Sequence, residues 1–111
     1  MARKTEKVQA GTGDVFRDLG FPDAGERKLR VQLAMRLNDL IQERKLAQAA
    51  AADIFGIPQP HVSELRHYKL KRFSSERLLH FITQLDRDVE IVIRPKAANH
   101  PSGLVSVLVA A

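Results

Sequence analysis

The stretch Leu46–Leu65, LAQAAAADIFGIPQPHVSEL, decides the fold of this 111-residue chain. Its first half is rich in alanine, a strong helix former, and it closes with the apolar pair Ile54 and Phe55 before Gly56. Glycine readily takes the left-handed conformation in which many helices end. The sequence therefore predicts a short helix over Gln48–Phe55 that stops at Gly56.

A further helix is predicted directly after a short turn that contains two prolines. Proline disfavours the helical conformation for the residue before it, but Pro60 itself suits the first position of a helix. We therefore expect Gln59 to be the N-cap of a helix over about Pro60–His67. Val62 and Leu65, three residues apart, would face inward, which leaves four polar side chains facing outward: Gln59, His61, Ser63 and Glu64.

Two short helices joined by Gly56-Ile57-Pro58 match a helix-turn-helix unit, in which the turn is short and often contains glycine. In such a unit the second helix presents polar side chains to base edges in the major groove of DNA. The Gln59 amide can pair with adenine, and the Glu64 carboxylate can accept from N4 of cytosine. The Ser63 hydroxyl can bond to donor or acceptor groups on a base edge, and His61 can donate to a base or a phosphate. The alternative is an ordinary solvated helix face.

Basic residues surround the second helix of the unit. Between Gln59 and Arg77 five basic side chains stand against two acidic ones, a local net charge of +3. We expect this segment to bind backbone phosphates through Arg66, His67, Lys69, Lys71 and Arg72. Gln48 begins a helix and can offer its amide and nearby backbone N–H groups to a phosphate oxygen. The alternative for the basic segment is a plain solvated linker.

The whole chain has 18 Lys and Arg against 13 Asp and Glu, a net charge of +5, which favours a polyanionic partner. Its length allows one compact domain and excludes a multidomain enzyme. The absence of cysteine excludes disulfides and thiolate zinc sites and fits the cytoplasm. No apolar run suggests a membrane span or a signal peptide. We expect no enzyme activity, cofactor or metal site, because neither a Ser-His-acid arrangement nor paired histidines occur.

Apolar residues recur every three or four positions on both sides of the unit. They predict a long helix over about Ala24–Arg44, with Asp23 as its N-cap and Leu29, Leu33, Leu37, Leu40 and Ile41 on the buried face. After Ser74, a plausible cap, a last helix runs to near Asp86 with the stripe Leu78, Leu79, Ile82 and Leu85.

Two β-branched runs at the end of the chain, Val89–Arg94 and Leu104–Val109, read as strands. Because both runs are apolar on both faces, something must cover them, and an open apolar edge invites aggregation. We predict that they pair between two protomers in one sheet, through Val89, Ile91, Ile93, Val105, Val107 and Val109. The alternative is a long-looped hairpin packed on its own helices.

Four segments together resemble a known family: LAQAAAADIFGIPQPHVSEL, VFRDLGFPDAGE (Val15–Glu26), KLKRFSSERLLHFI (Lys69–Ile82) and DRDVEIVIRP (Asp86–Pro95). They are similar to the lambda-repressor-like, Xre/Cro-type helix-turn-helix proteins, and among these to the HigA-type antitoxins. The resemblance implies a mainly α bundle of four to five helices. It also implies a homodimer on a palindromic operator, often with a RelE-like ribonuclease toxin as partner. The positions that would face DNA are Gln48, Gln59, Pro60, Ser63 and Glu64.

The chain departs from the family pattern at two positions. Ala47 stands where Thr usually caps the first helix of the unit, and replacing such a cap by Ala costs about 1 kcal/mol. Pro58 stands where Ser or another capping residue is common, which affects how the second helix begins.

These observations divide the chain into a flexible basic arm (1–14), a helix-turn-helix DNA-binding domain (15–86) and a C-terminal β dimerisation segment (87–111). The favoured function is a cytoplasmic, nucleoid-associated repressor. It would act as the antitoxin of a toxin pair, with the arm contacting the toxin. The alternatives are a stand-alone Xre-type regulator without a toxin and a protein-interaction module without DNA binding.

Overall fold

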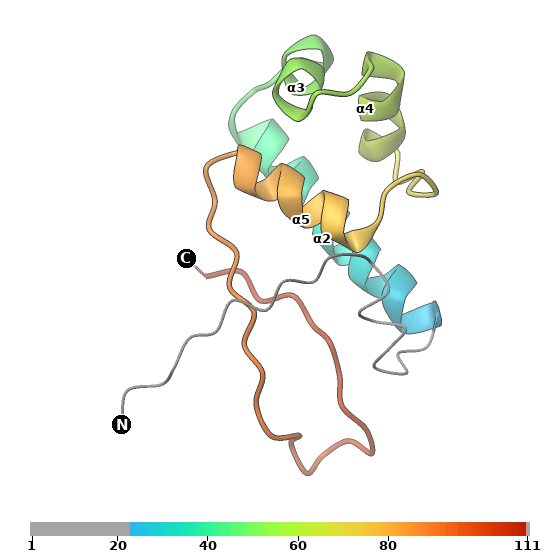
Figure 1. Cartoon of the computed structure of the whole chain (residues 1–111), viewed down its shortest axis with the longest axis vertical. Helices are drawn as coiled ribbons and strands as arrows, with labels where there is room; N and C mark the ends of the chain where they lie inside the picture. Colours follow the sequence, from blue (N-terminus) through green and yellow to red (C-terminus); the bar gives the residue numbers. More distant parts are fainter. Residues whose placement is uncertain (1–22, 111) are drawn as a thin grey trace.

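A computed structural model of the chain describes residues 23–110. In this part of the chain four helices form, α2 (Asp23–Glu43), α3 (Gln48–Phe55), α4 (Gln59–Arg66) and α5 (Ser75–Gln84). Figure 1 shows α5 lying against α2, with the short helices α3 and α4 next to each other along one side of this pair. None of these helices is long and apolar enough to cross a membrane. The predicted basic arm 1–14 lies outside the described residues.

Helix α2 supplies one side of the core, as its apolar spacing predicts. All five residues of the expected stripe are buried: Leu29, Leu33, Leu37, Leu40 and Ile41. The helix is described from Asp23, which is also the first residue that the structure describes, so the role of Asp23 as its N-cap stays a prediction. Its opposite end turns sharply at Lys45, which has a φ of 53°.

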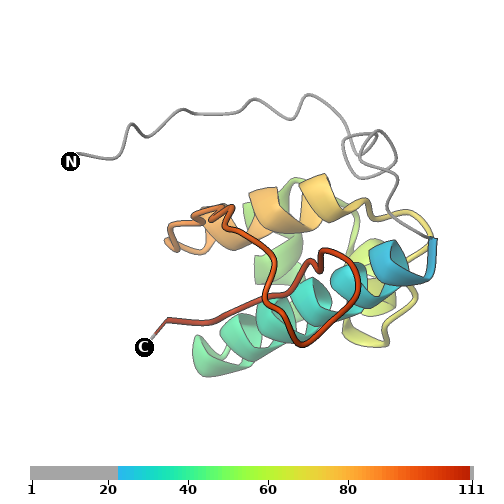
Figure 2. The same ribbon diagram turned by 90° about the horizontal axis from the view of Figure 1, so that it is seen from below.

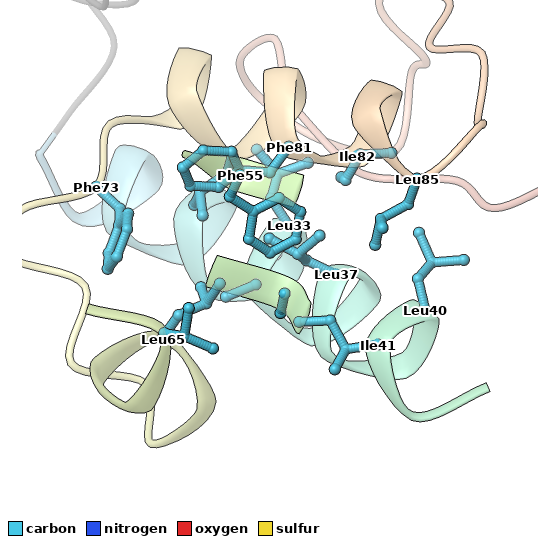
Figure 3. Close-up of a cluster of buried hydrophobic side chains, with 14 of the residues drawn as sticks. Leu33, Leu37, Leu40, Ile41, Phe55, Leu65, Phe73, Phe81, Ile82 and Leu85 are labelled. Atoms are coloured by element: carbon cyan, nitrogen blue, oxygen red, sulfur yellow. The ribbon is translucent and has the colours of Figure 1, made fainter. Parts of the chain in front are cut away.

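The core joins the short helices to the long ones through aromatic side chains (Figure 3). Phe55 of α3 stacks on Phe81 of α5 with ring centroids 4.6 Å apart, and Phe73 meets Phe81 edge-on at 6.1 Å. Leu65 of α4 is completely buried in the same cluster. Because burying one such side chain stabilises the fold by about 1.5–3 kcal/mol, this cluster fixes α3 and α4 firmly on the bundle.

The turn between α3 and α4 forms as the sequence predicts. Gly56 has a φ of 69°, in the left-handed region, and its N–H donates to the Ala52 carbonyl at 2.8 Å. Ile57 N–H donates to the same carbonyl at 3.1 Å, which closes the end of α3. The predicted bounds of α3 are confirmed.

Among α3, α4 and α5, the helix starts agree with the sequence in two cases and differ in one. The Ser74 Oγ caps α5 by accepting from the backbone N–H of Arg77 at 3.1 Å. Ala47 precedes α3 without a side-chain cap, as expected. Helix α4, however, begins at Gln59 and has Pro58 as N-cap, so the prediction of Gln59 as N-cap is wrong by one residue. The reason is that the His61 N–H reaches the Pro58 carbonyl at 3.0 Å, which starts the helical turn earlier.

The two predicted C-terminal strands are not formed within residues 23–110 of the single chain. Val89–Arg94 and Leu104–Val109 instead belong to an open loop that leaves α5 and returns past α2 (Figures 1 and 2). A strand requires a hydrogen-bonded neighbour, and the two segments do not pair with each other. The structure therefore does not confirm the strands, and their pairing, whether in a hairpin or between protomers, stays a prediction.

Candidate nucleic-acid interface

One side of helix α4 is buried against the bundle, and the opposite side, called its front below, is directed away from the core. Val62 and Leu65 have no exposed surface, and at about 100° per residue the opposite side of the helix is centred near Pro60, Ser63 and Glu64. Gln59 and Pro60, in the first turn, are exposed, whereas the remaining predicted base readers are half-buried: His61, Ser63 and Glu64. The prediction that Val62 and Leu65 face inward is confirmed, whereas Gln59 is the one of the four predicted outward polar residues that is exposed.

A buried asparagine, which the sequence analysis missed, fastens the end of α4 to α2. The Asn38 Nδ2 donates to the Leu65 carbonyl at 3.2 Å, and the Asn38 side chain is buried. Arg66 Nη1 donates in return to the backbone carbonyl of Asn38 at 3.1 Å and to its Oδ1 at 3.3 Å. Arg66, predicted to bind phosphate, is therefore turned toward α2 in this structure. The only sequence signal for Asn38 is its place on the apolar face, four residues after Ala34.

Glu64 and Arg72 are brought together, although the sequence assigned them separate roles. The Arg72 Nε donates to Glu64 Oε1 at 2.5 Å, and Nη2 donates to Oε2 at 3.4 Å. These hydrogen bonds lower the pKa of the Glu64 carboxyl and raise that of the Arg72 guanidinium. The predicted cytosine acceptor and one predicted phosphate ligand thus form a single ion pair beside the front of α4.

The segment after α4 alternates between anchored and exposed residues. Leu70 and Phe73 are buried, and the Leu70 carbonyl accepts from Arg30 Nη1 at 3.2 Å. Lys69 and Lys71 on either side of Leu70 are exposed. The buried residues thereby hold two ammonium groups at the surface beside α4, where the sequence predicted phosphate contacts.

The remaining predicted phosphate ligands lie at helix ends. His67, at the end of α4, is exposed, and its Nδ1–H donates to the Ser63 carbonyl at 2.8 Å. Gln48 is exposed at the start of α3. Because Ala47 offers no side-chain acceptor, no cap from that residue competes with a phosphate for the first N–H groups of α3.

The predicted dimerisation residues are not gathered into one surface by the single chain. Five of them are exposed: Val89, Ile91, Ile93, Val105 and Val109. Val107 is half-buried and packs against the core. With Val109 it borders a shallow groove on α2 that is also lined by Gln32, Met35, Arg36 and Asp39.

Comparison with known proteins agrees with this geometry. Residues 15–94 match a family described as a helix-turn-helix domain. Among solved structures, one described as an XRE family transcriptional regulator is 50% identical in sequence, with a TM-score of 0.77. The match covers 80% of this chain and 100% of that chain. No protein of curated function matches.

Proposed function

The chain belongs to the XRE family of helix-turn-helix proteins, and from this premise we propose that it is a DNA-binding transcriptional regulator that reads its operator with α4. The observation that carries the proposal is the outward polar face of α4, backed by the fully buried Val62 and Leu65. A helix held in this way can enter a major groove about 12 Å wide without losing its position on the bundle.

The residues around α4 divide into two roles in this proposal. Gln59, Ser63 and His61 read base edges. Pro60, which is exposed in the first turn of α4, offers an apolar contact beside them. Lys69 and Lys71 bind phosphates, and Gln48 positions the start of α3 against the backbone. Arg66 contributes to the position of α4, because its hydrogen bonds to Asn38 fasten the end of that helix to α2.

This division is tested with two exposed residues whose replacement leaves the core intact. Gln59→Ala is expected to lower affinity for the preferred site by about 1–3 kcal/mol and to relax selectivity at one base pair. Lys71→Ala is expected to weaken binding to all sequences alike and to reduce the slope of log K against log salt by about 0.9. Fluorescence anisotropy with specific and scrambled duplexes measures both effects. Identical behaviour of the two variants would contradict the division.

A finer part of the proposal makes the chain an antitoxin that represses its own operon and neutralises a RelE-like ribonuclease toxin. Its support is the resemblance of the sequence to HigA-type antitoxins, with the basic arm 1–14 as a toxin-contacting segment. Co-expression with the product of a toxin-sized reading frame next to its gene tests this role. Loss of growth inhibition and a stable complex are expected. Neutralisation that survives deletion of the arm would remove the role of the arm, and a gene without such a neighbour would favour a stand-alone regulator.

We also propose that the regulator acts as a homodimer on a palindromic operator in the cytoplasm. The support is the row of exposed apolar side chains near the C-terminus, among which Ile91 is 72%, Ile93 84% and Leu108 85% exposed. A monomer that left these residues in water would carry an aggregation hazard, whereas pairing with a second copy would cover them.

A further inference from the structure

We propose that Arg72 is a positioning residue for Glu64, and that the two side chains read a base pair as one unit. The proposal rests on the DNA-reading role of α4 given above. It assigns Arg72 a contribution to sequence selectivity in place of the phosphate contact that its charge alone suggests.

The ion pair lies where a base reader belongs. Glu64 is on the side of α4 opposite Val62 and Leu65, and both of its carboxylate oxygens accept from Arg72. Each carboxylate oxygen has two acceptor positions, so one at each oxygen remains after the contact with Arg72. The Glu64 carboxylate can therefore still accept a hydrogen bond from a base while Arg72 fixes its direction.

The position of Arg72 is set by the protein core. Its backbone carbonyl accepts from Arg77 Nη1 at 3.2 Å. The guanidinium of Arg77 in turn lies 5.3 Å from the ring centroids of both Phe73 and Phe81, which are buried. A chain of contacts thus runs from the core through Arg77 and Arg72 to Glu64, and it holds the carboxylate in place before DNA arrives.

The ion pair between Glu64 and Arg72 also affects how the Glu64 carboxylate approaches DNA. A lone carboxylate on a helix that approaches DNA is repelled by the phosphates, and pairing with a guanidinium removes that net charge. The same hydrogen bonds lower the pKa of Glu64, so the group stays ionised and acts only as an acceptor. The unit therefore selects a base that presents an amino donor, such as N4 of cytosine, and disfavours one that presents a carbonyl oxygen.

The experiment compares base preferences of the full chain and its variants by competition binding with single-base-pair changes in the preferred duplex. Glu64→Gln and Arg72→Gln are both expected to relax preference at the same base pair, by about 5- to 150-fold. The double variant is expected to be no less selective than either single one. Arg72→Lys, which keeps the charge without the bidentate contact, is expected to keep general affinity and lose that preference.

Lys71→Ala is the matched control, because Lys71 is an exposed cation in the same segment. It is expected to lower affinity uniformly and to leave every base preference intact. If Arg72→Gln also lowers affinity for all sequences equally and reduces the slope of log K against log salt by about 0.9, Arg72 is a phosphate ligand. That result would overturn this inference but leave the proposed function standing. Absence of sequence-selective binding by the unaltered chain would overturn the proposed function and this inference together.

An NMR titration of the Glu64 carboxyl examines the pair without DNA. Its pKa is expected to lie below the ordinary 4.5 in the unaltered chain and to rise toward that value in Arg72→Gln. An unchanged pKa in Arg72→Gln would show that Arg72 does not position Glu64. Thermal unfolding of each variant confirms that the differences arise from the pair rather than from loss of the fold.

Discussion

Gly56 is the residue on which the geometry of the helix-turn-helix unit depends most directly. Its φ of 69° lies in the left-handed region, which costs other residues about 1–2 kcal/mol. A Cβ placed on Gly56 would meet no atom within 4 Å, so the backbone conformation alone opposes substitution. The effect of a change at Gly56 is therefore a clean measure of the turn.

Gly56→Ala is expected to lower the free energy of unfolding by about 1–2 kcal/mol, measured by urea denaturation. Gly103→Ala is the control, because Gly103 also has open space around it and lacks a positive φ. That control is expected to change stability by less than about 0.5 kcal/mol. Equal losses in the two variants would show that the conformation of Gly56 is not what stabilises the turn.

Residue identity predicted some of these local structures and not others. Gly56 and Ser74 were predictable, because glycine and serine have strong preferences for helix ends and helix starts respectively. Lys45 and Tyr68 also take the left-handed conformation, with φ of 53° and 60°. Their identity does not predict this conformation, because residues other than glycine adopt it only when the surrounding contacts stabilise it.

At the scale of a single helix, α5 depends on its cap. Ser74→Ala is expected to destabilise the fold by about 1 kcal/mol, because the Arg77 N–H loses its acceptor. Ser75→Ala is the matched control, since the neighbouring hydroxyl is buried without a hydrogen-bond partner among the described residues. Removing that hydroxyl is expected to leave stability unchanged or slightly higher. A larger loss in Ser75→Ala than in Ser74→Ala, by calorimetry, would contradict this assignment.

The helices were predictable because each carries a repeated apolar pattern, and the contacts between them were not. Asn38 donates to the last turn of α4, and Gln84 donates to the Ile54 carbonyl of α3 at 3.0 Å. Each long helix thus sends one side-chain amide to a carbonyl near the end of a short helix. Such contacts join residues about 30 positions apart in sequence, and no local pattern contains them.

The same limit explains the C-terminal segments. Their β-branched composition favours strands, but a strand forms only when a neighbour completes its hydrogen bonds, and the single chain supplies none to residues 87–110. The residues of Val89–Arg94 therefore favour a strand, and a second copy of the chain could supply the hydrogen-bonded neighbour that this strand needs. On α4 the sequence predicted the buried side chains of Val62 and Leu65, yet it could not show that Glu64 is paired with Arg72.

At the scale of the whole molecule, dimerisation through the C-terminal segments is expected to govern operator affinity. Ile93→Lys places a charge at a side chain that is 84% exposed in the single chain, so the fold of the monomer should tolerate it. It is expected to shift the chain from dimer to monomer in sedimentation equilibrium at micromolar concentration and to weaken operator binding.

Ala49→Lys is the control for that experiment, because it adds the same charge at an exposed position of α3. It is expected to leave the dimer intact. A monomer in the unaltered chain, or a dimer that Ile93→Lys does not disturb, would contradict pairing through these segments.

The central claim, that the front of α4 reads a DNA sequence, is tested most directly by selecting bound duplexes from a randomised pool at several salt concentrations. We expect enrichment of an inverted repeat whose half-sites lie about 10 base pairs apart or a multiple of that, with affinity that falls steeply as salt rises. A pool that remains random after selection, or binding that does not change with salt, would contradict it.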